Sequence, residues 1–177
     1  MRLQKDFFLT FSITIFLLIL GEIFTSTVFP LVGLQFFRLH FNILLVLYLC
    51  FKQDHPILPI AIFIIQYVHS FFTIEGWAIG TFAGVAIGMV VGRLKDTIHL
   101  SSYTITVFFM QVFQLLWFGF TSLLAYLKFN RADVLVDRFW QYLPESVCLS
   151  FISPQLFNLL DKLWRPKNPE GVYGANS

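Results

Sequence analysis

Polar side chains that could bind or pair with other groups interrupt the apolar runs of this sequence. Glu22 and Arg38 are ionisable, and a lone charge in hydrocarbon is unfavourable by about 3 kcal/mol even on lenient insertion scales. A contact between the two side chains would lower that cost and is one of two predictions. The alternative is that each side chain reaches the water interface independently. Glu145 directly follows Pro144, a position typical of a helix start, where the helix dipole favours a carboxylate. The full set of buried polar candidates is Glu22, Arg38, Asn42, Gln66, His69 and Glu145.

None of these residues falls into a spacing that is typical of catalysis or metal binding. His40 and His69 are far apart in the sequence, no HExxH pair is present, and no GxSxG, P-loop or zinc-deaminase pattern occurs. We therefore expect no catalytic residue, no metal ligand and no cofactor. A small membrane enzyme is an alternative, and its activity would have to disappear when Glu145 or Asp161 is neutralised.

Composition decides which kind of fold must position these side chains. Apolar residues make up 57% of the 177 residues and charged residues 12%, against about 25% charge in soluble domains. Mean hydropathy is +0.74, and a soluble fold of this size could not bury so much apolar surface. The net charge of +2 is too small to indicate a nucleic-acid partner. The sequence therefore predicts an all-α, polytopic membrane protein that is embedded in the lipid bilayer.

Six apolar stretches are candidates for transmembrane helices, which need about 20 residues each. Hydropathy places them at 7–25, 33–51, 57–72, 76–92, 100–127 and 144–163, with a mixed, amphipathic segment at 128–143. With six spans, most of the twelve Lys and Arg residues fall on the side of both termini, so that side is expected to be cytoplasmic. We predict one six-helix transmembrane domain over residues 1–165 and a polar tail, expected to be disordered, over 166–177.

The fourth apolar stretch carries a regular stripe of small residues. Glycines recur at every fourth position, which keeps them on one slowly drifting helix face, and small-xxx-small faces let membrane helices approach closely. The stripe is either internal packing or a face for another subunit. Within the chain, we predict that it packs against a second stripe at spacing four in the last apolar stretch. The two stripes are Gly76, Gly80, Gly84, Gly88 and Gly92, and Ser146, Ser150, Pro154 and Asn158.

Two segments resemble the MreD family of bacterial rod shape-determining membrane proteins. The segment RLHFNILLVLY at 38–48 is similar to the second hydrophobic segment of the family, in which a basic and a polar residue precede an aliphatic run. Asn42 matches the polar position, and Phe41 stands where the family usually has proline. The segment GWAIG at 76–80 resembles the paired glycines of the family, although Phe72 lies where the family has an aspartate.

The resemblance implies a non-enzymatic component of the bacterial cell-elongation machinery in the inner membrane. Such proteins bind the bitopic MreC scaffold and help couple the MreB filament to peptidoglycan synthases. They fold like the substrate-binding subunits of energy-coupling-factor vitamin transporters, and such a subunit is the alternative function. It would dock through small residues on its first helix, and those are missing here. It would also need a polar cavity, for which the candidates are Glu22, Arg38, His40, Gln66, His69 and Glu75.

Overall fold

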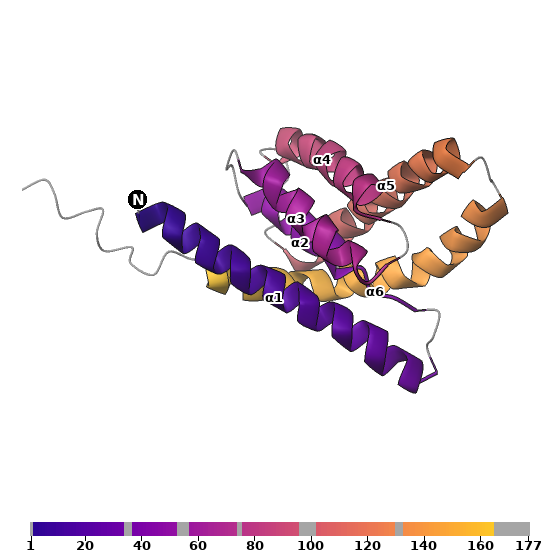
Figure 1. Cartoon of the computed structure of the whole chain (residues 1–177), viewed down its shortest axis with the longest axis horizontal. Coiled ribbons are helices and arrows are strands. Elements are labelled where there is room, and N and C mark those ends of the chain that lie inside the picture. Colours follow the sequence, from indigo (N-terminus) through magenta and orange to yellow (C-terminus); the bar gives the residue numbers. More distant parts are fainter. Residues whose placement is uncertain are drawn as a thin grey trace, which may run out of the picture.

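The computed structural model describes residues 2–33, 37–52, 57–73, 76–95, 102–129 and 133–164. Within these ranges the chain forms six α-helices and no strand, which confirms the predicted all-α class (Figure 1). The predicted polar tail at 166–177 lies outside the described residues. The helices are α1 (Arg2–Leu31), α2 (Phe41–Lys52), α3 (Leu58–Ser70), α4 (Trp77–Leu94), α5 (Tyr103–Phe129) and α6 (Asp133–Trp164).

Helix α2 forms the centre of the bundle. Its residues from 42 to 50 are all buried, and α2 packs against each of the other five helices. The side chains of Leu44, Val46 and Leu47 have no exposed surface. A helix that is apolar on every side belongs either in lipid or in the interior of a protein, and here the neighbouring helices enclose it.

Three of the six described helices are long and apolar enough to cross a membrane, so the prediction of six spans is wrong. These are α4 and the segments Phe7–Leu31 of α1 and Tyr103–Leu127 of α5. With 12 and 13 residues, α2 and α3 reach only about 18–20 Å, short of the roughly 30 Å of a hydrocarbon core. Helix α6 has 32 residues but is not among the three, because polar and charged side chains such as Glu145 and Asp161 lie along it. Three apolar helices of this length still indicate a membrane protein.

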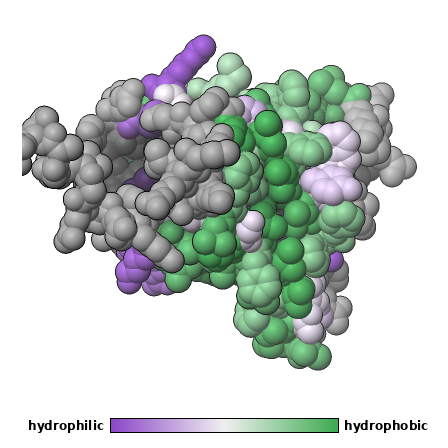
Figure 2. All heavy atoms as spheres, turned by 60° about the vertical axis from the view of Figure 1, so that its left-hand side comes forward, coloured by the Kyte–Doolittle hydropathy of each residue, from purple (hydrophilic) through white to green (hydrophobic). Residues whose placement is uncertain are grey.

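Large apolar side chains cover the outward faces of the long helices. Phe8 and Phe16 on α1, Phe82 on α4 and Phe108 on α5 each expose more than half of their surface. Figure 2 shows a broad hydrophobic surface on one side of the molecule, with hydrophilic groups towards its edges. A continuous apolar surface of this kind is unfavourable in water and matches the acyl chains of a bilayer.

Helix α6 runs without interruption through two predicted segments. The amphipathic segment 128–143 and the apolar stretch 144–163 are predicted as separate elements, but residues 133–164 form one helix that contains Pro144 and Pro154. Proline is tolerated within membrane helices where neighbouring groups satisfy the freed backbone atoms. Pro144 therefore does not start a helix, and the prediction that Glu145 caps a helix start is wrong.

The glycine stripe of α4 packs against α2, α3 and α5. A Cβ atom on Gly84 would lie 2.7 Å from Cγ2 of Ile62 on α3 and 3.0 Å from the ring of Trp117 on α5. A Cβ atom on Gly88 would lie 3.0 Å from Sγ of Cys50 on α2. No Cα atom of α4 lies within 8 Å of a Cα atom of α6 in the described part of the chain. The predicted pairing of the α4 and α6 stripes is therefore wrong, and the middle of the glycine stripe serves packing inside the bundle.

The small polar residues of α6 face α5 instead. Gln111 Nε2 donates to Ser146 Oγ at 3.0 Å, and Gln114 Nε2 donates to Ser150 Oγ at 2.9 Å. The Ser150 hydroxyl donates to Oε1 of Gln111 at 2.9 Å. Buried hydroxyl groups need hydrogen-bond partners, which the glutamines of α5 offer and the glycines of α4 do not. The remaining members of the predicted stripe are Pro154, which is buried, and Asn158, which is exposed.

Candidate functional site

One cavity of about 390 Å³ collects most of the polar side chains that the sequence singles out. It lies where α2 begins and α3 ends, and parts of α4, α5 and α6 complete its wall. The cavity reaches the surface, because Arg38, Gly76 and Arg138 in its wall are exposed. The polar residues of the wall are Arg38, His40, Asn42, Gln66, His69, Thr73, Thr121, Ser122, Arg138, Gln141, Tyr142 and Glu145.

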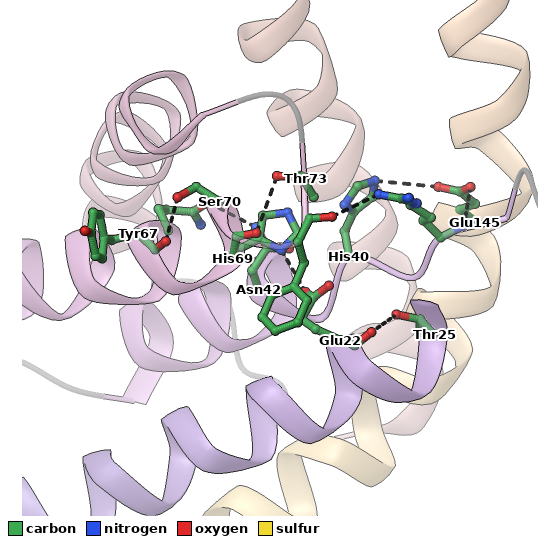
Figure 3. Close-up of polar contacts among 12 residues, drawn as sticks. Glu22, Thr25, His40, Asn42, Tyr67, His69, Ser70, Thr73 and Glu145 are labelled. Carbon is green, nitrogen blue, oxygen red and sulfur yellow. Dashed lines mark hydrogen bonds and ion pairs between the residues drawn. The ribbon is translucent and has the colours of Figure 1, made fainter. Parts of the chain in front are cut away.

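A buried carboxylate and imidazole pair connects the cavity wall to α1. His69 Nδ1 lies 2.7 Å from Oε1 of Glu22, and the two residues expose only 7% and 5% of their surface (Figure 3). At this distance the ring nitrogen and the carboxyl oxygen form a hydrogen bond. The predicted contact between Glu22 and Arg38 is therefore wrong: α3 supplies the partner, and the unfavourable burial of the carboxylate is offset by a histidine instead of an arginine.

Arg38 and Glu145 join the segment before α2 to α6. The backbone N–H of Arg38 donates to Oε1 of Glu145 at 2.7 Å, and its guanidinium Nη1 donates to the carbonyl oxygen of Phe72 at 3.1 Å. Oε2 of Glu145 lies 3.7 Å from Nε2 of His40, a contact drawn in Figure 3. The Glu145 carboxylate thus fixes the edge of the cavity by holding together two parts of the chain that are 107 residues apart.

Two buried side-chain amides lie side by side in the wall. Asn42 Nδ2 donates to Gln66 Oε1 at 3.1 Å, and these residues expose 3% and 2% of their surface. Asn42 Oδ1 and Gln66 Nε2 have no hydrogen-bond partner among the described residues. A Cβ atom on Gly80 would lie 2.5 Å from Gln66 Oε1. The glycine stripe of α4 therefore has a second role, because it makes room for a polar group of the cavity.

Aromatic rings from α5 and α6 form another part of the wall. Trp117, Phe118 and Tyr142 all line the cavity. The rings of Phe118 and Tyr142 are stacked with their centroids 4.7 Å apart, and the Tyr142 hydroxyl donates to the backbone oxygen of Gln114 at 2.9 Å. Trp117 is held against Gly84, where a Cβ atom would come within 3.0 Å of its ring. The rings are thus fixed in place by contacts with neighbouring helices.

The prediction from sequence misses the contribution of α5 and, apart from Glu145, of the first half of α6. On α6, the wall residues follow the spacing i, i+3, i+4, i+7, which places Arg138, Gln141, Tyr142 and Glu145 on one helix face. This spacing is visible in the sequence once residues 133–164 are taken as one helix. It is hidden when the chain is divided at Pro144.

The wall offers hydrogen bonds of both kinds, charge of both signs and a flat aromatic surface. The volume of the cavity lies within the range of sites that bind small organic molecules. Among the described residues, no group of three or more His, Cys, Asp and Glu side chains is arranged to hold a metal ion. The wall thus presents hydrogen-bond donors, hydrogen-bond acceptors and aromatic rings in one space.

Comparisons with known proteins identify no relative. No protein-family model, no curated protein and no solved structure matches this chain. The resemblance of residues 38–48 and 76–80 to the MreD family accordingly stays a prediction.

Proposed function

We propose that this protein is a membrane-embedded binding protein that takes up a small polar solute in the cavity between α2 and α6. The observation that supports this proposal is the gathering of Arg38, Asn42, Gln66, His69 and Glu145 around one cavity. These residues come from three separate parts of an otherwise apolar bundle, namely the start of α2 with the segment before it, α3, and α6. Ionisable and polar groups inside a membrane protein are unfavourable, and they usually mark the path or the site of a substrate.

A scaffold protein would gain nothing from such a cavity. Helix contacts in lipid depend on close packing of small residues and on hydrogen bonds between helices, and an internal space removes packing contacts. Two of the wall residues, Asn42 and Gln66, also each have a buried amide atom without a hydrogen-bond partner among the described residues. Buried polar atoms are normally hydrogen-bonded, so a bound solute accounts for both the space and the open atoms.

Two more specific functions are compatible with different parts of this reasoning. The substrate-binding subunit of an energy-coupling-factor transporter is the form of solute binding predicted from the sequence, and it requires the polar cavity. The role in cell elongation, with an MreC-type scaffold and peptidoglycan synthases as partners in the bacterial inner membrane, rests on the family resemblance alone. Both predictions place the chain in a membrane without enzymatic activity of its own.

The proposal is tested by native mass spectrometry of the full chain in detergent micelles after incubation with a polar metabolite extract. We expect one solute to remain bound to the wild-type protein. The Gly80→Leu variant should lose it, because the new side chain starts from the cavity wall, where a Cβ atom already meets Gln66. Gly92→Leu is the matched control, since nothing lies within 4 Å of a Cβ atom at that position of the same helix.

Two outcomes would contradict solute binding in this cavity. One is a wild-type protein that never retains a solute, and the other is a solute that survives the Gly80→Leu substitution. Stable co-purification with a bitopic scaffold protein from the cell-elongation machinery, combined with an empty cavity, would favour the scaffold function instead.

A further inference from the structure

We infer that the solute is a planar heterocycle with an amide or ureide edge, that is, adjacent C=O and N–H groups on a flat ring. This inference rests on the proposed function and specifies the class of molecule that the cavity binds. It follows from three features of the wall: one open acceptor, one open donor and a fixed aromatic surface.

The open acceptor and the open donor belong to the same pair of amides. Asn42 Nδ2 already donates to Gln66 Oε1, so Asn42 keeps its Oδ1 acceptor and Gln66 keeps its Nε2 donor. Both residues are more than nine-tenths buried, and leaving such atoms without partners is unfavourable. A solute that presents an N–H group to Asn42 and a C=O group to Gln66 satisfies both atoms together.

The backbone of α4 fixes the direction of the Gln66 amide. Its Oε1 atom is in contact with Gly80, where a Cβ atom would come within 2.5 Å. The Oε1 end of the amide is therefore held by α4 and by the Nδ2 group of Asn42. Since the oxygen is committed to these neighbours, the end that remains for a ligand is the Nε2 donor.

The aromatic surface favours a flat molecule. Trp117, Phe118 and Tyr142 line the same cavity, and the ring of His40 lies 6.1 Å from that of Tyr142. Flat rings bind to such surfaces by stacking or by edge-to-face contact.

The charged groups of the wall make contacts of their own. The Arg38 guanidinium donates to the carbonyl oxygen of Phe72, and the Glu145 carboxylate accepts the Arg38 backbone N–H beside His40. The two amide atoms therefore add a demand for a hydrogen-bonding edge to the charges that Arg38, Arg138 and Glu145 bring to the wall.

Lumazine, a pteridine-2,4-dione, and 1,3-dimethyllumazine are suitable probes. Both have the same planar ring and the same carbonyl groups, but methylation removes the ring N–H donors. We would measure binding of each compound to the full chain in lipid nanodiscs by equilibrium dialysis. We expect lumazine to bind at least tenfold more tightly than the dimethyl compound, because only lumazine can donate to Asn42 Oδ1.

Two variants test the role of the amide pair. Gln66→Glu replaces the Nε2 donor with an oxygen at nearly constant shape and should weaken lumazine binding at least tenfold, whereas the same change at the exposed Gln155 of α6 should have no effect. Gly80→Ala should also weaken binding, because the new methyl group displaces the flexible end of Gln66. This second variant keeps the test decisive if a buried glutamate prevents folding.

The outcomes separate the ligand class from the existence of a site. Equal binding of the two probes, no binding of either, or full binding by both variants would overturn the inference. If lumazine fails while native mass spectrometry still finds a different solute that Gly80→Leu removes, the ligand class is wrong and the proposed function stands. If no solute binds at all, both are wrong.

Discussion

The hydrogen bond between Glu22 and His69 connects α1 to α3. α1 is a long apolar helix. Among its described side chains, Glu22 is the one that is both ionisable and buried. Its contact with His69 on α3 is a short hydrogen bond between two buried side chains. Removing one partner of such a pair is more harmful than removing both, because an uncompensated polar group then stays buried.

The Glu22 and His69 pair is expected to behave as one unit in a double-mutant cycle. His69→Leu leaves a buried carboxylate without a partner, which should lower the free energy of unfolding by about 3–5 kcal/mol. Glu22→Leu leaves an unpaired ring N–H group and should lower it by about 1–3 kcal/mol. The double variant should lose clearly less than the sum. Denaturant unfolding in detergent micelles measures all four proteins, and additive losses would contradict the pairing.

Residue types in the sequence identify most of the polar wall, but they do not reveal which groups pair. Glu22, Arg38 and His69 are each conspicuous because they interrupt apolar runs. The partner of each one depends on the rotation of its helix and on which helices are neighbours, and neither follows from local spacing. The pairing of Glu22 with the nearby Arg38 is plausible by sequence distance, yet His69, 47 positions away, is its partner.

At the scale of elements, the glycine stripe of α4 is not uniform. The middle glycines touch other helices, whereas a Cβ atom on Gly92 would meet nothing within 4 Å. The sequence spacing alone gives all five glycines the same weight. In the structure, the glycines differ in whether a side chain of another helix lies next to them. The same substitution should therefore lower stability at one glycine and raise it at another.

Gly84→Ala and Gly92→Ala should change stability in opposite directions. At Gly84 the new methyl group would come within 2.7 Å of Cγ2 of Ile62. This atom can move away only if the Ile62 side chain changes its rotamer or the main chain shifts. We expect a loss of about 1–3 kcal/mol in the free energy of unfolding. At Gly92 the higher helix propensity of alanine should raise it by up to about 1 kcal/mol. Thermal unfolding in detergent compares the two variants, and equal effects would contradict the packing described here.

The pairing of α6 with α5 rather than α4 can be tested by cross-linking. In a Cys148→Ser background, cysteines introduced by Gln111→Cys and Ser146→Cys should be joined rapidly by a short bifunctional thiol reagent, because these side chains are hydrogen-bonded in the wild type. The pair Gly92→Cys with Ser146→Cys is the control and should not react, since α4 and α6 are not neighbours and Gly92 has room for the new side chain. Cross-linking of the control pair at the same rate would show that the helix order is wrong.

The number and approximate positions of the helices follow from the sequence, but their surroundings do not. Hydropathy recognises α2 as an apolar run, yet it does not distinguish lipid from protein as the medium around it. The complete burial of residues 42–50 is therefore invisible in the sequence. Pro144 is a second source of error, because a proline typical of helix starts is here accommodated inside α6.

At the scale of the whole molecule, three long apolar helices surround a short buried one. The outer surface is formed by side chains such as Phe16 on α1 and Leu116 on α5, which are half exposed or more, while Leu44 on α2 has no exposed surface. The lipid contact of this protein is thus unevenly distributed among helices of similar hydropathy.

A photoactivatable reagent that dissolves in lipid should reveal this difference. After irradiation of the protein in liposomes and peptide mapping, we expect strong labelling of α1, α4 and α5 and almost none of α2. The reason is that the reagent reacts with groups in contact with acyl chains, which α2 lacks. Comparable labelling of α2 and α1 would contradict the arrangement and would restore the prediction of a lipid-facing second span.

The enclosure of α2 has a consequence for biogenesis. A segment of 12 residues is too short to be released from the translocon into the bilayer as an independent span, for which about 20 residues are needed. It gains a stable environment only after α4, α5 and α6, which are synthesised later, have closed around it. Nascent chains that end before α5 should therefore remain accessible to chaperones and membrane proteases, and the final folding step should come late in synthesis.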